Sequence, residues 1–188
     1  EFFEVYSWKQ LRLHKKPIFI YNLNNFWDEL INLIDRLIDE DFAGEKMKEA
    51  VMKVMEGYVT AYKNNDKELF LSLWDEAAIF EDPVGAEPCK GIDSISAFWD
   101  FGHSNGMNIT PVNEEFVVCA NEGILKATMQ VRNDNDNSGM DISIVDHFIV
   151  NDEGKIISGR AFWDDGSITS PDNLESLTVN IDDFKDRG

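Results

Sequence analysis

Apolar residues recur at helical spacing early in the chain and alternate with polar residues in its second half. Between residues 45 and 64 the apolar positions are spaced by four, three, four and three residues, at Met47, Val51, Val54, Tyr58 and Ala61. This spacing predicts one long amphipathic helix that buries these side chains, the Tyr58 ring among them. From about residue 108 onward we expect strands instead, at 108–119, 123–132, 140–150 and 155–163.

Polar segments separate the expected strands. Asn121-Glu122-Gly123 and 151–154 are suited to hairpin turns, and 133–139 forms a longer polar loop. Before the strands come a short helix through residues 69–74, a strand at 77–80 and a helix that Asp93 can cap. Helices followed by an antiparallel meander predict an α+β domain, in which a curved, cone-shaped sheet wraps around the long helix.

The N-terminal segment has a different pattern. Residues 1–14 read as a helix, 18–21 as a strand, and a second helix capped by Asn24 or Asn25 follows. Helix, strand and helix in series form a piece of an α/β layer that has no sheet of its own to join. The chain also begins at Glu1 without a methionine, and we therefore expect a fragment or a processed product.

Ala43-Gly44 separates the two patterns, and the expected domain boundaries follow from it. We expect an α/β remnant at 1–43, the α+β domain at 44–168, and an acidic tail at 169–188. The tail carries little core-forming material, so we expect it to be mostly disordered and solvated, with at most a turn or an edge contact.

Composition narrows the classes of partner. Apolar residues make up 43% of the chain, which predicts a folded protein, and 36 acidic against 17 basic residues disfavour nucleic acids and acidic membrane surfaces. The chain has neither an apolar run of membrane-spanning length nor a signal peptide, and we expect a cytoplasmic protein. Two cysteines, Cys89 and Cys119, and three scattered histidines predict no metal site; each cysteine is expected to be buried or half-buried.

Asp82 is the first candidate for chemistry. It follows the apolar residues 77–80, and Pro83 restricts it to extended backbone conformations. A carboxylate held at the end of a strand suits a general base, although an aspartate before a proline is more often a way to open a turn.

Asp146 is the second candidate. It shares a strand face with Ile142, Ile144 and Phe148, where burial would raise its proton affinity until it is neutral and can donate a hydrogen bond. Two alternatives are open: that face is exposed, or Asp146 pairs with a buried arginine such as Arg160. Together with the hydroxyl of Tyr58, the two acids suit abstraction of a proton next to a carbonyl, with two donors holding the enolate oxygen.

Residues 50–168 resemble the ketosteroid isomerases, members of the superfamily of nuclear transport factor 2 (NTF2-like) and the SnoaL polyketide cyclases. Four segments carry the resemblance: Glu81-Asp82-Pro83-Val84-Gly85-Ala86-Glu87-Pro88, Tyr58-Val59-Thr60-Ala61, Val145-Asp146-His147-Phe148 and Arg160-Ala161-Phe162-Trp163. The resemblance implies that Asp82 is the base and that Tyr58 and protonated Asp146 form the oxyanion hole. In that family the two carboxyl groups are known to have different pKa values, so that one acts as a base and the other stays protonated.

The resemblance also implies a substrate, a partner and the absence of a cofactor. It implies a steroid delta-isomerase acting on a small, flat, apolar ketone without cofactor or metal, and a homodimer formed through the sheet. We expect five aromatic residues to contact the substrate: Trp74, Phe98, Trp99, Phe148 and Trp163. The chain departs from some members at Trp99, where they have a further tyrosine, and at the longer loop 133–139.

Residues 1–41 resemble the C-terminal part of the LONELY GUY (LOG) family, Rossmann-like phosphoribohydrolases that release cytokinin-type bases. The matching segments are Glu1-Phe2-Phe3-Glu4-Val5, Trp8-Lys9-Gln10-Leu11, His14-Lys15-Lys16-Pro17 and 22–28. The family's glycine-rich signature would end at Glu1, so the phosphate-binding glycines are not in this sequence. We therefore expect a truncated neighbour or docking element.

Two other functions remain open. One is a SnoaL-like cyclase, dehydratase or hydrolase, which a wide and wet pocket around Asp82 would favour. The other is a non-catalytic binding or dimerisation module fused to a LOG-type enzyme, for which Asp146 would be exposed and Tyr58 would not face Asp82.

Overall fold

The computed structural model describes residues 21–39 and 45–177. The chain divides into two compact units, Glu1–Lys46 and Met47–Gly188. In the first unit, a 3-10 turn η1 (Leu23–Asn25) precedes helix α2 (Asp28–Asp39). The Asn22 side chain accepts a hydrogen bond from the Trp27 backbone N–H, where we expected Asn24 or Asn25 to cap the helix. The helix and strand expected within residues 1–20 lie outside the described residues.

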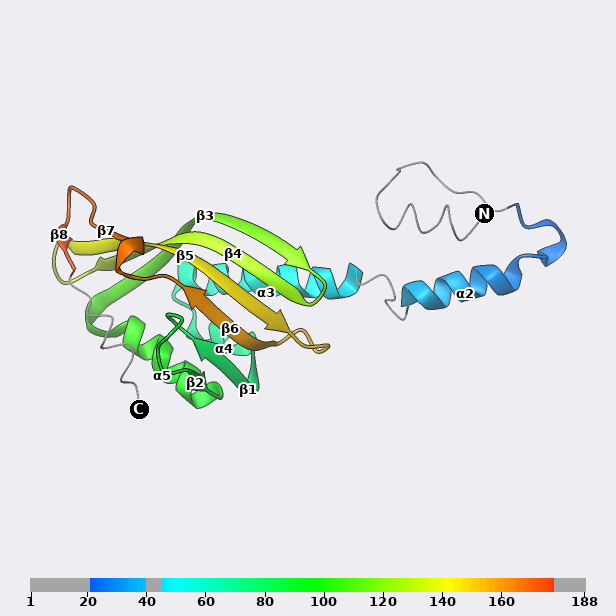
Figure 1. Ribbon diagram of the computed structural model, residues 1–188, viewed down its shortest axis with the longest axis horizontal. Helices are drawn as coiled ribbons and strands as arrows, with labels where there is room; N and C mark the ends of the chain where they lie inside the picture. The colour runs from blue at the N-terminus through cyan, green and yellow to red at the C-terminus, as the bar shows by residue number, and fades with distance from the viewer. Residues whose placement is uncertain (1–20, 40–44, 178–188) are drawn as a thin grey trace. The chain divides into compact units, whose positions relative to one another are not determined.

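The described part of the second unit, up to residue 177, contains a sheet and three helices of four residues or more (Figure 1). The helices are α3 (Glu45–Asn64), α4 (Lys67–Ser72) and α5 (Ile92–Gly102). The main strands are β1 (Trp74–Glu81), β2 (Cys89–Lys90), β3 (Met107–Cys119), β4 (Glu122–Asn133), β5 (Ser138–Val150) and β6 (Ile156–Phe162). Short elements complete it: η2 (Ser104–Gly106), η3 (Asp165–Ser167), β7 (Ile168–Thr169) and β8 (Glu175–Ser176).

The main strands lie in the order β2-β1-β6-β5-β4-β3. β3 to β6 form the expected antiparallel meander, with registers such as Leu125↔Asp146 and Asp146↔Ala161. β1 pairs with β6 in parallel, which the expectation of a purely antiparallel sheet missed. Because β1 joins the far side of the meander, its C-terminal end at Glu81 lies beside Arg160.

Helix α3 packs against the meander and completes the core (Figure 1). The buried face of the helix includes Val51, Met55 and Tyr58, and each is at most 2% exposed. Gly123 permits the close approach, because a Cβ there would lie 2.6 Å from the sulfur of Met55 and 2.8 Å from a Val51 methyl. The predicted α+β fold with a curved sheet around a long helix is confirmed.

Four local expectations need correction. Trp74 begins β1, where we expected it at the end of the preceding helix. Gly91 occupies the N-cap position of α5, and Asp93 lies in the first turn of that helix. Cys119 is exposed. Residues 168–177 carry β7 and β8, both paired with β5, and so differ from the tail that we expected to be mostly disordered.

Candidate active site

Tyr58 projects from the middle of α3 into the core. Only 2% of the residue is exposed, and its ring lies among aromatic rings, with centroid distances of 5.0 Å to Phe148 and 5.7 Å to Phe70. Because long helical side chains lean toward the preceding turn, the heptad-like spacing of α3 fixes the direction in which the phenol points. A second phenol, Tyr62, follows one helical turn later at 5.0 Å between centroids.

Asp82 stands just after β1, on a turn that the neighbouring strand anchors. The Glu81 carboxylate accepts hydrogen bonds from Gly85 N at 2.8 Å and from Arg160 Nε at 2.8 Å. These two donors lower the pKa of Glu81, the Gly85 amide contributing more. Val84 N also donates to the carbonyl of Ala161 on β6. The turn is therefore tied to β6, and the restricted carboxylate of Asp82 is held in place as we expected from Pro83.

Asp82 itself accepts a hydrogen bond from an aromatic donor. The Trp163 indole Nε1–H donates to Asp82 Oδ1 at 2.6 Å. Trp163 follows β6 directly, so strand β6 positions both the turn and the side chain that orients Asp82.

Asp146 lies in the buried row of β5. Its side chain is 1% exposed, and within the described residues its Oδ1 atom has no hydrogen-bond partner. The alternative of a partnership with Arg160 is wrong, because Arg160 points to the opposite face and binds Glu81. The alternative of an exposed strand face is wrong as well.

Burial and neighbouring charges raise the pKa values of Asp146 and Tyr58. Burial, and then the charge of Asp82, raise the pKa of Asp146 well above its ordinary value, which favours the protonated form of this carboxyl. Burial is also the main reason why the pKa of Tyr58 is raised; Tyr62, Asp146 and Asp82 add to it. The raised pKa values favour the protonated forms of Asp146 and Tyr58, which can then act as hydroxyl donors beside the carboxylate of Asp82.

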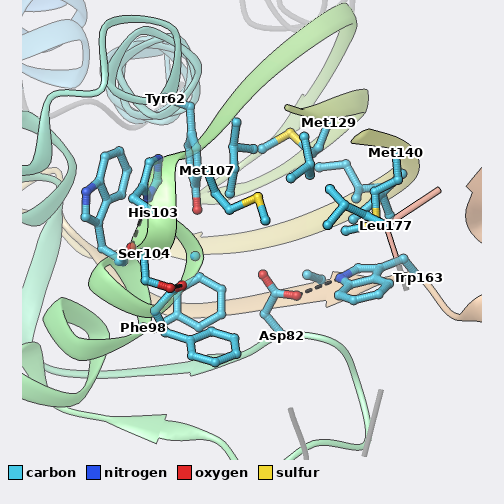
Figure 2. A pocket seen from close by; sticks show the side chains of 18 of the residues that line it. Tyr62, Asp82, Phe98, His103, Ser104, Met107, Met129, Met140, Trp163 and Leu177 are labelled. Carbon is cyan, nitrogen blue, oxygen red and sulfur yellow. Dashed lines mark hydrogen bonds between the residues drawn. The ribbon is translucent and has the colours of Figure 1, made fainter. Parts of the chain in front are cut away.

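A cavity of about 330 Å³ is lined by Tyr58, Asp82 and Asp146 together. Figure 2 shows Asp82 at this cavity, with Trp163 beside it. Most of its other lining side chains are apolar: Phe98, Trp99, Phe101, Met107, Ile109, Met129, Val131, Met140, Ile142, Ile144, Ala161, Trp163 and Leu177. The structure therefore brings the three residues that we expected to act together to one largely apolar cavity.

Three of the five expected aromatic contacts line this cavity, namely Phe98, Trp99 and Trp163. Trp74 and Phe148 do not. They are 4% and 0% exposed, and their rings pack on those of Phe80 and Tyr58 behind the cavity wall. The expectation of direct substrate contact is not supported for these two, because they belong to the core.

Two ionisable residues of the cavity lining were not among the predicted site residues. Tyr62 is 5% exposed, and a side-chain hydrogen bond links its hydroxyl to that of Tyr58. Figure 2 shows the Tyr62 hydroxyl directed into the cavity. Burial, followed by the charge of Asp82, raises the pKa of Tyr62. The available signal was the spacing of four residues from Tyr58, which places both phenols on one helical face.

The second is His103, at the C-terminal end of α5. Its ring stacks on Trp99 with centroids 4.0 Å apart, and its Nδ1 lies 2.9 Å from the Trp99 carbonyl oxygen. Burial lowers the pKa of His103. A neutral imidazole that donates from Nδ1 to this carbonyl fits both observations. Among the described residues, no group of three or more His, Cys, Asp or Glu side chains is arranged to hold a metal ion.

The described residues also contain no helix long and apolar enough to span a membrane. The structure is thus an α+β fold, in which a curved sheet and a long helix surround a mainly apolar cavity with ionisable groups. Residues 55–159 match the family model described as a SnoaL-like domain. The chain belongs to this SnoaL-like family.

Solved structures with the same fold include two of different kinds. The epoxide hydrolase/cyclase-like enzyme SalBIII, which has a role in pyran ring formation in the polyether salinomycin, shares 22% identity at a TM-score of 0.58. The match covers 68% of this chain and 99% of that one. RV0760c from Mycobacterium tuberculosis, in complex with estradiol-17beta-hemisuccinate, shares 19% identity at a TM-score of 0.56, over 64% of this chain and 98% of that one. At these identities the likeness concerns the fold.

Residues 1–64 match a second family model, described as possible lysine decarboxylase. The cytokinin riboside 5'-monophosphate phosphoribohydrolase LOG2 of Arabidopsis thaliana is 35% identical over 52 residues, which are 28% of this chain and 24% of that protein. The rice (Oryza sativa subsp. japonica) enzyme LOG is 31% identical over 72 residues, 34% of this chain and 30% of that protein. The chain spans less than a third of these relatives, and the expected LOG-like segment is supported. The family match extends past the expected boundary at residue 43 into α3.

Proposed function

We propose that the α+β domain is an isomerase that moves a carbon–carbon double bond into conjugation with a ketone. The observation that supports this best is the shared cavity of Asp82, Tyr58 and Asp146, in which one carboxyl is buried and protonated and the other is bound by an indole N–H. A base and two proton donors around one apolar space are what enolisation of a ketone requires.

In the proposed reaction Asp82 removes a proton from the carbon between the ketone and the double bond. The C–H electron pair forms the new C=C bond of a dienolate, and the negative charge moves to the ketone oxygen. Tyr58 and Asp146 donate hydrogen bonds to that oxygen without losing their protons. Asp82 then returns its proton to the far carbon of the dienolate, which restores the ketone and leaves the double bond conjugated.

The surrounding groups fit these roles. The Trp163 indole N–H binds Asp82 Oδ1 and so orients the carboxylate that acts as the base in the proposed reaction. The raised pKa of Asp146 keeps it a donor while Asp82 is charged, and the same applies to Tyr58. Protein side chains thus supply the base and the electrostatic stabilisation, and the proposed reaction involves no cofactor or metal.

The proposed substrate is a small, flat, apolar ketone of steroid-like character. Aromatic and methionine side chains dominate the cavity wall, and its volume lies at the lower end of the range for ligand sites. RV0760c, which has the same fold, was solved with an estradiol derivative, and this also favours a flat polycyclic ligand.

A second candidate is a SnoaL-like hydrolase or cyclase that acts on an epoxide. SalBIII and an epoxide hydrolase of Mycobacterium tuberculosis, which resembles the LEH type, share the fold. In that case Asp82 would activate a water or a substrate hydroxyl, and Tyr58 and Asp146 would protonate the opening epoxide oxygen. The non-catalytic binding module fused to a LOG-type phosphoribohydrolase has less support, because it calls for an exposed Asp146 and that residue is 1% exposed.

We propose a homodimer that forms through the outer face of the sheet. Val117, Val145 and Phe162 are 62%, 39% and 43% exposed, and they lie on strands β3, β5 and β6. Val145 and Phe162 are direct neighbours across the β5–β6 ladder. On β4 the neighbour of Val145 is Lys126, so the exposed apolar contact area consists of the Val145–Phe162 pair with Val117 at a distance on β3. Exposed apolar residues that lie side by side favour a protein–protein contact on this face.

The proposed activity is tested with a 5-ene-3-ketosteroid, by following the ultraviolet absorbance of the conjugated enone. Wild-type protein should produce the enone. Asp82→Asn should abolish the reaction, and the exposed control Asp93→Asn should leave it unchanged. No enone from the wild type, or an unimpaired rate for Asp82→Asn, refutes the proposal. Turnover of an epoxide in place of the ketone would favour the hydrolase.

A further inference from the structure

The segment after β6 forms part of the cavity wall. After η3, the chain returns along β5: β7 pairs at Ile142↔Ile168, and β8 pairs at Ser138↔Glu175 and Gly139↔Ser176. Glu175 N donates to the Asn137 carbonyl at 2.8 Å. The next residue but one, Leu177, lines the cavity. A residue far from the predicted site in sequence therefore contacts the same space as Asp82.

The attachment of this segment depends on Gly139. A Cβ at Gly139 would lie 2.7 Å from a Leu174 methyl and 2.9 Å from the Val131 carbonyl oxygen. Leu174 thus packs directly on the sheet backbone and does not line the cavity. The segment has two leucines with different positions: Leu174 packs on β5, and Leu177 contacts the cavity.

The cavity has two different ends (Figure 2). Leu177, Met129, Met140 and Trp163 lie on one side of Asp82, and His103 with Ser104 lies on the other. The Leu177 end is apolar, because its side chains are aliphatic, thioether or indole groups. The segment 164–177 contains no basic residue and four acidic ones, namely Asp164, Asp165, Asp172 and Glu175. Arg132, which lies across from Gly139 on β4, is paired with Asp141. The acidic residues of the segment would therefore disfavour an anionic group at this end.

We propose that Leu177 forms an apolar subsite that binds the uncharged end of the substrate and limits the length of the molecule that fits. This inference rests on the proposed function, since it assumes that the ketone oxygen lies at Tyr58 and Asp146. The Leu177 backbone N–H donates to the Gly139 carbonyl, seven residues along β5 from Asp146, so a short molecule held at Asp146 does not extend to Leu177. Leu177 is then a determinant of length and charge specificity, remote from the reacting atoms.

The test compares the binding of two phenols, whose oxygen accepts hydrogen bonds as the ketone oxygen would. 2-Naphthol is short and estradiol is long, and quenching of tryptophan fluorescence reports the Kd of each without turnover. Leu177→Ala should weaken estradiol binding ~10-fold through lost apolar contact and leave 2-naphthol within about twofold. Leu177→Trp should weaken estradiol by more than Leu177→Ala does, because the larger ring occupies the end of the cavity.

Leu174→Ala is the matched control, since it removes the same atoms from the same segment outside the cavity. Because Leu174 also anchors the segment to β5, Leu174→Ala should change the ratio of the two Kd values less than Leu177→Ala does. A steroid phenol with a carboxylate at the far end should bind more weakly than estradiol, and Leu177→Arg should reverse that order. Four results would overturn the inference. Leu177→Ala could affect both phenols equally or affect neither, Leu174→Ala could produce the same change as Leu177→Ala, or the wild type could bind neither phenol.

The result is separable from the proposed function. If the protein binds the phenols with the expected Leu177 dependence but makes no enone, the subsite stands and the isomerase assignment fails. If it makes enone and Leu177→Ala leaves the binding ratio unchanged, the isomerase assignment stands and the subsite fails.

Discussion

The protonated state of Asp146 has a measurable consequence for stability. The folded protein holds the Asp146 proton above the ordinary pKa of 3.8, whereas the unfolded chain releases it near that value. The stability that this proton contributes is complete below the unfolded pKa and is lost as the pH rises through the folded pKa. Asp146→Asn keeps the shape and hydrogen-bonding capacity of the neutral acid and does not titrate.

The magnitude follows from linkage. Between the unfolded and folded pKa values the folded state binds one more proton, so the free energy of unfolding falls by about 1.4 kcal/mol per pH unit. Relative to wild type, Asp146→Asn should therefore gain stability at this slope as the pH rises above 4.5, and the gain should end where the pH passes the folded pKa of Asp146. Glu81 and Glu114 also have shifted pKa values, in the lowering direction, and their contributions cancel in the comparison because both proteins contain them.

Urea denaturation of both proteins at several pH values measures this difference. In an Asp82→Asn background the Asp146 pKa should be less raised, since the Asp82 charge is its second cause, and the gain should end at a lower pH. A difference between wild type and Asp146→Asn that stays constant from pH 4.5 to 6.5 would show that Asp146 is ionised in the folded protein. The assignment of Asp146 as a donor would then be refuted.

Three further predictions concern the neighbouring groups. Tyr58→Phe should lower kcat in the enone assay by roughly 10²–10³-fold, because it removes a donor to the enolate oxygen. Tyr62→Phe removes the bond to Tyr58 and should lower kcat about tenfold. Equal losses of kcat in the two variants would contradict this order. Trp163→Phe removes the N–H that orients Asp82 and should reduce kcat about tenfold with a smaller change in KM, and an effect confined to KM would contradict the positioning role. Phe162→Asp should convert a dimer into a monomer in light scattering, and a wild-type monomer would refute the sheet-face contact.

Periodicity predicted most of the fold. The helix α3 and the meander β3 to β6 follow from spacings that the chain repeats over many residues, and their bounds agree with expectation to within two residues. The partner of β1 did not follow, because local alternation shows that a strand exists but not which strand it pairs with. The segment 168–177 was read as a tail because its polar residues conceal two short ladders to β5.

The candidate site was predictable where one residue breaks a pattern. Asp146 is a carboxyl in an otherwise apolar row, and Asp82 is a carboxyl that ends an apolar strand before Pro83. Both residues line the cavity. Phe148 shares the face of Asp146 yet belongs to the core, since residues two apart on a strand are about 7 Å apart and meet different neighbours. Alternation thus identifies the buried face but cannot divide it between core and cavity.

The central claim is that Asp82 removes a proton from the carbon next to a ketone. A saturated 3-ketosteroid in D₂O has such protons but no double bond to move, so NMR loss of its α-hydrogen signals reports this step alone. The wild type should catalyse the exchange, and Asp82→Asn should reduce it to the rate without enzyme. Exchange at equal rates in wild type and Asp82→Asn, or none in either, would contradict the role assigned to Asp82.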